Sequence, residues 1–145
     1  MNVLIVCTGN TCRSPMAEGF LNHIANTKKL DIIASSAGLY VPGGSFVSDN
    51  SVKTMLEFGI DISKHVPKQL NAELIKSADI IITMTEYQKN TIINLLPEFS
   101  SKVYTLMDIG ETTEVVDPFG SGIEMYKQCA DLIYSGVKDF LNKII

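Results

Sequence analysis

The fold class is decided by residues 2–15, which read NVLIVCTGNTCRSP. The run Val3–Val6 is continuous, apolar and rich in β-branched residues, which is typical of a buried strand, so we expect a strand over 2–7. Pro15 suits the first position of a helix, and Ser14 before it has a side chain that caps helices. We therefore predict a strand, a short glycine-containing loop and a helix over 15–27. This unit is typical of α/β proteins with a parallel sheet.

The rest of the chain continues this alternation of strand and helix patterns. We predict further strands over 31–37, 79–84 and 103–106, and helices over 49–58, 71–77, 85–95 and from 121 to the C-terminus. A parallel sheet with helices on both faces follows, which makes three layers. Ligands of such sheets bind beyond the C-terminal ends of the strands, and Cys7 stands at such an end.

Capping patterns and apolar spacing predict where two helices begin and which face of a third is buried. Thr85 with Gln88, and Ser121 with Glu124, fit the capping box that begins a helix. In the helix expected over 49–58, the spacing predicts that Leu56 faces the core.

The loop that follows Cys7 has the residue types that hold an anion beside a thiol. The backbone N–H groups of Thr8–Cys12 and the positive end of the following helix attract an anion and stabilise a thiolate. Gly9 permits a positive backbone angle, and Asn10 tolerates one better than most residues. Arg13 offers a planar fork that matches two phosphoryl oxygens, and it heads a helix that repels it unless an anion binds there. Cys7 is thus a candidate nucleophile toward phosphorus, the alternative being a buried structural cysteine.

The pattern Cys7-x5-Arg13-Ser14 between a strand and a helix resembles the phosphate loop of cysteine-dependent protein phosphatases. Because the loop lies at the extreme N-terminus, the chain resembles the low-molecular-weight protein tyrosine phosphatase family, over nearly all of its length. The resemblance implies one domain over 1–145 with a four-stranded parallel sheet in the order 2-1-3-4. It also implies phosphorylated proteins as substrates, a phosphocysteine intermediate and inorganic phosphate as product. Three further segments fit the family in order: Ser35-Ser36-Ala37-Gly38, Gly59-Ile60-Asp61-Ile62-Ser63-Lys64-His65 and Asp117-Pro118-Phe119-Gly120.

The resemblance implies roles for residues inside and outside the loop. Asp117, in an Asp-Pro-aromatic segment, is the candidate general acid, although Asp-Pro also begins ordinary turns. Tyr40 and Phe119 are candidates for the walls of the cleft. Substrate contacts are expected from the loop residues Thr8, Gly9, Asn10, Thr11, Cys12 and Ser14. A supporting hydrogen-bond network is expected from Asn10, Ser14, Ser36 and His65.

Two positions bear on the choice of substrate. Members of the family that act on phosphotyrosine commonly hold a bulkier aliphatic residue at the position of Thr11, whereas members that act on phosphoarginine have threonine there. Gly120 stands where the family usually has a second aromatic residue, which argues against a deep slot for a phosphotyrosine ring. We therefore expect phosphoarginine in proteins as the substrate, with phosphotyrosine as the alternative.

Two other classes of protein remain as alternatives. An arsenate reductase of this architecture would need a later pair of cysteines, but residues 75–95 contain none. A phosphate-binding module without turnover would not need an acid such as Asp117 over the site.

The three cysteines, an odd number, do not fit a secreted disulfide framework, and no spacing of metal ligands occurs. We therefore expect no metal and no cofactor. Cys12 lies in the same loop as Cys7, and the resemblance implies a reversible disulfide between them that protects the nucleophile from over-oxidation. The alternative is that Cys12 is a plain core thiol. Cys129 is expected in the apolar packing of the last helix.

The length and the charge limit the domain count and the partners. A chain of 145 residues, 46% of them hydrophobic, fits one domain with one core. The net charge of −4 gives no general attraction to nucleic acid or to an anionic membrane. The first apolar run is too short to span a bilayer, so we expect a cytoplasmic protein, acting as a monomer.

Overall fold

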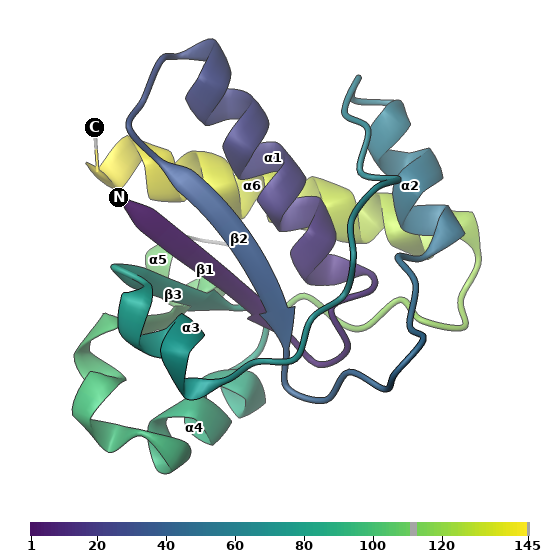
Figure 1. Ribbon diagram of the computed structural model, residues 1–145. Helices are drawn as coiled ribbons and strands as arrows, with labels where there is room; N and C mark the ends of the chain where they lie inside the picture. Colours follow the sequence, from purple (N-terminus) through teal and green to yellow (C-terminus); the bar gives the residue numbers. More distant parts are fainter. Residues whose placement is uncertain (111–112, 145) are drawn as a thin grey trace.

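A four-stranded parallel sheet lies between two layers of helices (Figure 1). The computed structural model describes residues 1–110 and 113–144. The strand order is β2-β1-β3-β4, which confirms the predicted fold class and the predicted order. The strands are β1 (Asn2–Cys7), β2 (Ile33–Gly38), β3 (Ile80–Thr83) and β4 (Val103–Thr105). The helices are α1 (Arg13–Thr27), α2 (Asp49–Leu56), α3 (Ala72–Ser77), α4 (Glu86–Leu95), the 3-10 helix η1 (Pro97–Lys102), α5 (Leu106–Ile109) and α6 (Ile123–Ile144).

The central strand β1 pairs with β2 along one edge and with β3 along the other, and a hydrophobic core covers each of its faces. Its side chains alternate between two cores, as strand geometry requires. Val3, Ile5 and Cys7 pack into the larger core with α1, α2, α5 and α6. Leu4 and Val6 pack into the smaller core with α3 and α4. Cys7 therefore reaches the C-terminal edge of the sheet on the side of α1 and α6.

Several element ends differ from the sequence prediction. Helix α1 begins at Arg13, and the Ser14 side chain does not cap it but hydrogen-bonds inside the loop. Helix α6 begins at Ile123, so Gly122 rather than Ser121 directly precedes it. Leu56 is 54% exposed and not in the core as predicted, because Ser51, Thr54 and Met55 form the buried face of α2. The capping box of Thr85 and Gln88 is confirmed.

None of the helices in the described ranges combines the length and the apolar character that crossing a bilayer requires.

The end of β2 supports the loop after β1 through main-chain contacts. The N–H groups of Leu39 and Tyr40 donate to the carbonyls of Cys7 and Thr8, at 3.0 and 2.9 Å. At Gly38, a Cβ atom would lie 2.8 Å from the Thr8 oxygen and 2.9 Å from the Gly9 carbonyl carbon. Both of these atoms belong to the backbone, which cannot give way as a flexible side chain does. Glycine at this position thus allows the two segments to touch.

We expect Gly38→Ala to lower the free energy of unfolding by about 1–3 kcal/mol, the usual cost of forcing an extra carbon into a packed site. Urea denaturation monitored by circular dichroism measures this change. Gly43→Ala is the matched control, because a Cβ atom there meets nothing within 4 Å. Equal stability of the two variants would show that the contact of Gly38 with the loop is not tight.

Candidate functional site

A pocket of about 290 Å³ lies at the C-terminal end of β1. Three segments far apart in the sequence meet there: the loop after β1, the connection between β2 and α2, and the connection between α5 and α6. The pocket therefore lies where ligands of parallel α/β sheets bind. Its lining residues are Cys7, Thr8, Gly9, Thr11, Cys12, Arg13, Pro42, Ser45, Asp117 and Phe119.

The thiol of Cys7 has a buried hydroxyl group as its neighbour. Sγ of Cys7 lies 2.9 Å from Oγ of Ser14. That Oγ accepts from Nδ2 of Asn10 at 2.7 Å, so the Ser14 hydroxyl proton remains free to donate to the sulfur. Ser14 therefore lies beneath the pocket and acts on Cys7, which agrees with its expected place in the supporting network.

Asn10 is the centre of that network, and its side chain is fully buried. Nδ2 also donates to Oγ of Ser36 at 2.9 Å, and the Ser36 hydroxyl in turn donates to Oε1 of Glu18 at 2.7 Å. Oδ1 of Asn10 accepts from the backbone N–H of Lys68 at 3.0 Å. The φ of Asn10 is 57°, a left-handed conformation that asparagine tolerates better than most residues. The amide side chain thus holds the backbone of the loop in this turn.

His65 completes the network from the segment between α2 and α3. Its Nε2 lies 3.1 Å from Oδ1 and 3.2 Å from the carbonyl oxygen of Asn10, both acceptors, so Nε2 carries a hydrogen. Burial lowers the pKa of His65, and the carboxylate of Glu18 opposes that shift. The structure therefore brings together Asn10, Ser14, Ser36 and His65 as the sequence predicts, and adds Glu18 to them.

Arg13 is 4% exposed and connects the pocket to the segment that carries Asp117. Its Nη1 donates to the carbonyl oxygen of Val115 at 3.0 Å, and its Nη2 lies 3.7 Å from Oδ2 of Asp117. Its Nε is buried and has no hydrogen-bond partner among the described residues. A buried guanidinium with an unpaired donor is costly, and an anion in the adjoining pocket would offset that cost.

Hydrogen bonds hold the segment that carries Asp117 in place on both sides of this residue. Val115 donates its N–H to the carbonyl of Met84 at 3.2 Å, and Oδ1 of Asp117 accepts from the N–H of Phe119 at 3.0 Å. Sγ of Cys129 donates to the carbonyl of Val116 at 3.2 Å. Burial raises the pKa of Cys129 to about 11, which keeps the proton that this bond needs. The side chain of Asp117 itself is 51% exposed, so it can exchange protons with solvent.

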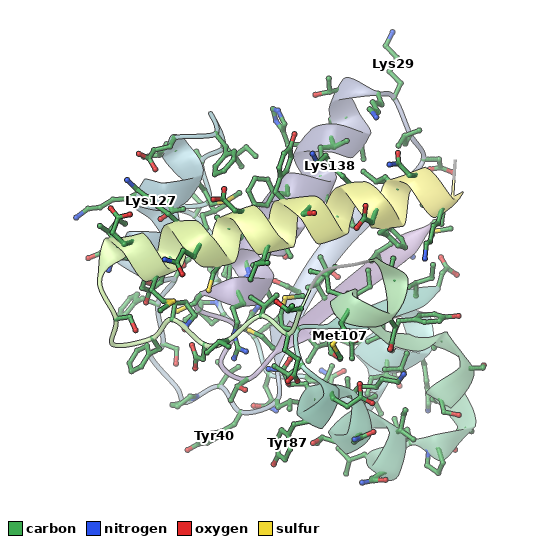
Figure 2. The ribbon with its side chains drawn as sticks, turned by 180° about the vertical axis from the view of Figure 1, so that it is seen from behind. Lys29, Tyr40, Tyr87, Met107, Lys127 and Lys138 are labelled. Carbon is green, nitrogen blue, oxygen red and sulfur yellow. The ribbon has the colours of Figure 1, made fainter. Side chains whose placement is uncertain are left out.

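Tyr40 does not line the pocket. Its backbone pairs with Thr8, which turns the side chain outward, where it is 65% exposed and extends from the rim of the molecule (Figure 2). Pro42 and Ser45 of the same connection line the pocket instead. Phe119 does line it, with 75% of its surface exposed.

Three further contacts fix the loop, and none was predicted from the sequence. Nε2 of Gln88 donates to Oγ1 of Thr8 at 3.2 Å, while its Oε1 closes the capping box of α4. The N–H of Ser48 donates to the carbonyl of Thr11 at 2.8 Å. The hydroxyl of Tyr126 lies 3.5 Å from Sγ of Cys12. Only Gln88 had a signal in the sequence, the capping box itself, which indicates a helix start and not a contact with the loop.

Nothing in the described ranges resembles a metal centre, since no three His, Cys, Asp or Glu residues there lie close enough to share an ion. All three cysteines are buried free thiols. The chemistry that the pocket can perform therefore comes from a thiol nucleophile, a guanidinium with backbone donors, and a carboxyl group, which is the equipment for transferring a phosphoryl group to sulfur.

Comparison with known proteins agrees with this chemistry. The family model for low molecular weight phosphotyrosine protein phosphatase matches residues 2–145. A protein-arginine-phosphatase of Bacillus subtilis (strain 168) is 38% identical over 133 residues, which cover 90% of this chain and 88% of the relative. The crystal structure of a low molecular weight protein tyrosine phosphatase from T. tengcongensis has a TM-score of 0.94 and 38% identity, covering 99% of each chain.

A solved structure of the YwlE arginine phosphatase, a mutant with a phosphorylated active-site serine, has a TM-score of 0.93 and 33% identity, covering 99% of this chain and 95% of that one. Matches of this extent and identity leave one assignment. The chain belongs to the low molecular weight phosphotyrosine protein phosphatase family.

Proposed function

We propose that this chain hydrolyses phosphoarginine in proteins through a phosphocysteine intermediate on Cys7. The observation that carries the proposal is the convergence of Cys7, Arg13 and Asp117 on one pocket at the end of β1. A module that only binds phosphate would need the arginine and the loop amides, but not a thiol and a carboxyl group. An arsenate reductase would need further cysteines. The thiol of Cys129 donates a hydrogen bond to the carbonyl of Val116 and has no partner thiol among the described residues.

The first step transfers the phosphoryl group to sulfur. The thiolate of Cys7, stabilised by the hydroxyl of Ser14, forms a bond to phosphorus while the bond from phosphorus to the leaving nitrogen breaks. Arg13 and the N–H groups of the loop bind the phosphoryl oxygens, where negative charge is redistributed in the transition state. The carboxyl group of Asp117 donates a proton to the leaving nitrogen, so the arginine side chain departs as a guanidinium group, its usual charged state.

The second step regenerates the enzyme. The carboxylate of Asp117 accepts a proton from a water molecule, whose oxygen attacks phosphorus as the bond from phosphorus to sulfur breaks. Inorganic phosphate leaves, and the thiolate of Cys7 and the acid form of Asp117 are restored. The hydrogen bond from Arg13 to Val115 supports this double role of Asp117, because it holds the segment that carries Asp117 beside the bound phosphoryl group.

The walls of the pocket favour a guanidinium leaving group over a phenol. Hydroxyl groups of Thr8, Thr11 and Ser45 line the pocket together with one aromatic ring, that of Phe119. A slot for a phosphotyrosine ring wants apolar walls on both faces, but Tyr40 points outward and Gly120 has no side chain. The arginine phosphatase activity named for the Bacillus subtilis relative supports the same choice.

Phosphotyrosine remains the second candidate, because the tyrosine phosphatase of T. tengcongensis is equally similar in sequence. The phosphorylated serine in the YwlE mutant supports a covalent intermediate at the matching position of that enzyme. The proposal also takes residues 1–145 as one domain that works as a cytoplasmic monomer on phosphorylated proteins, without a metal or a cofactor. The net charge of −4 supports the expectation that neither nucleic acid nor an anionic membrane is a partner.

Removing the nucleophile or the acid should have distinct effects. We expect Cys7→Ser to abolish hydrolysis of p-nitrophenyl phosphate, because a serine hydroxyl at this site is a far weaker nucleophile than a thiolate.

We expect Asp117→Ala to slow the release of poor leaving groups by about 10²–10⁴-fold, and the release of good leaving groups much less. Steady-state kinetics with a series of aryl phosphates measures both effects. Asp131→Ala, on the exposed side of α6, is the control. Rates of Asp117→Ala that are independent of the leaving group would remove the acid role.

Thr11→Ile should shift the choice of substrate. An isoleucine there replaces a hydroxyl by apolar surface, so we expect a lower ratio of kcat/KM for phosphoarginine peptides to that for phosphotyrosine peptides. Matched peptides that differ only in the phosphorylated residue give the ratio. Thr27→Ile, at the far end of α1 and exposed, should keep it unchanged. An unaltered ratio in Thr11→Ile would discard the specificity argument.

The buried histidine predicts a pH dependence of stability. Because burial lowers the pKa of His65, the unfolded chain binds a proton at this site that the folded chain does not. The contribution of His65 to the free energy of unfolding is complete above about pH 6.5, the usual pKa of histidine. It is lost as the pH falls toward the lowered pKa of the folded state. We expect the free energy of unfolding to decrease between pH 7 and pH 5, and less steeply in His65→Gln.

Urea denaturation at several pH values measures these slopes. His23→Gln is the control, because His23 is exposed and lies outside the network. If His23→Gln changes the slope as much as His65→Gln does, the pH dependence does not come from the buried ring of His65.

A further inference from the structure

A second depression, of about 520 Å³, adjoins the phosphate pocket. The two share the residues Thr11, Ser45 and Phe119, which form a common wall. We call this depression the side groove. The rest of its lining comes from the connection before α2, the first turns of α2 and α6, and the segment after Asp117: Phe46, Ser48, Asn50, Gly120, Ser121 and Tyr126.

The side groove differs from the phosphate pocket in its charge. None of its lining residues is ionisable at neutral pH, whereas Arg13 and Asp117 face the phosphate pocket. Burial raises the pKa of Tyr126 to about 12, so the buried tyrosine is neutral as well. A phosphate or a carboxylate would lose its hydration there without gaining a charged partner.

Two phenyl rings stand exposed at this groove. Phe46 is 83% exposed and Phe119 is 75% exposed. Exposed aromatic rings beside a functional pocket are typical of recognition surfaces, because covering them removes apolar area from water. Other residues of the groove are held in place by the fold. The N–H of Ser48 donates to the carbonyl of Thr11, and Tyr126 is 3% exposed and lies beside Cys12.

We propose that the side groove binds an apolar side chain of the substrate protein, within two residues of the phosphorylated one, with Phe46 as the main contact. This inference rests on the proposed function. Its argument is continuity: Thr11, Ser45 and Phe119 border both depressions, so a substrate segment that leaves the phosphate pocket past these residues enters the groove. An extended segment places neighbouring side chains within reach of both depressions.

The test compares phosphoarginine peptides that differ at one position next to the phosphorylated residue. Leucine, serine or aspartate is placed in turn at each of the two positions on either side, and phosphotyrosine versions are made in parallel. We expect the wild type to show, at one of these positions, a kcat/KM about five- to tenfold higher for leucine than for serine, the effect of covering a modest apolar area. Phe46→Ser should bring the ratio close to one.

Two further variants test whether the preference for leucine comes from the side groove. Leu95→Ser also removes an exposed apolar side chain, of 67% exposure, but at the end of α4 far from the C-terminal edge of the sheet, and should keep the wild-type ratio. Asn50→Lys places a positive charge in the groove and should raise kcat/KM for the aspartate peptide relative to the leucine peptide. Circular dichroism checks that each variant is folded.

The outcomes separate this inference from the proposed function. If the wild type hydrolyses p-nitrophenyl phosphate and the phosphopeptides but does not distinguish leucine from serine at any position, the side groove is not a substrate site and the phosphatase assignment stands. The same holds if Phe46→Ser keeps the wild-type ratio. If the wild type hydrolyses none of these compounds, the proposed function itself is wrong, and the inference falls with it.

Discussion

The buried side chain of Asn10 is the constraint on which the phosphate loop depends. Its amide makes hydrogen bonds to Ser14, to Ser36 and to the backbone of Lys68, and it does so from a left-handed backbone conformation. An amide is suited to this place because it offers two donors and an acceptor on one planar group. Aspartate would lack the donors and would add a charge at a fully buried position. The loop keeps its shape because β2, α1 and the segment before α3 all meet at this one residue.

The same bonds determine the polar surroundings of the nucleophile. The oxygen of Ser14 accepts from Nδ2 of Asn10, and its hydroxyl proton is available to the sulfur of Cys7, 2.9 Å away. The Ser36 hydroxyl is oriented in the same way, by donating to Glu18. Donation thus runs outward from the Asn10 amide along two branches, one through Ser36 to the carboxylate of Glu18 and one to Ser14, which lies beside Cys7. Connected hydrogen bonds of this kind polarise one another and are stronger than isolated pairs.

The sequence predicts the fold well because the evidence for it is local. A continuous apolar run before a glycine-containing loop indicates β1, and the capping box of Thr85 and Gln88 indicates the start of α4. The pattern from Cys7 to Arg13 predicts the centre of the pocket. What the sequence could not predict depends on contacts between distant segments. Tyr40 points outward because its backbone pairs with Thr8, and Gln88 reaches the loop only because α4 begins beside it.

The site divides into a buried part and an exposed part that come from different residues. The network of Asn10, Ser14, Ser36 and His65 lies within the fold, whereas Phe46 and Phe119 stand on connections with most of their surface in water. Substitutions at exposed positions of this kind usually change stability little, while a change at Asn10 would disturb four segments at once. Over evolutionary time, a lineage with this scaffold can therefore acquire new preferences for target proteins by altering its rim, and can inherit the reaction itself without modification.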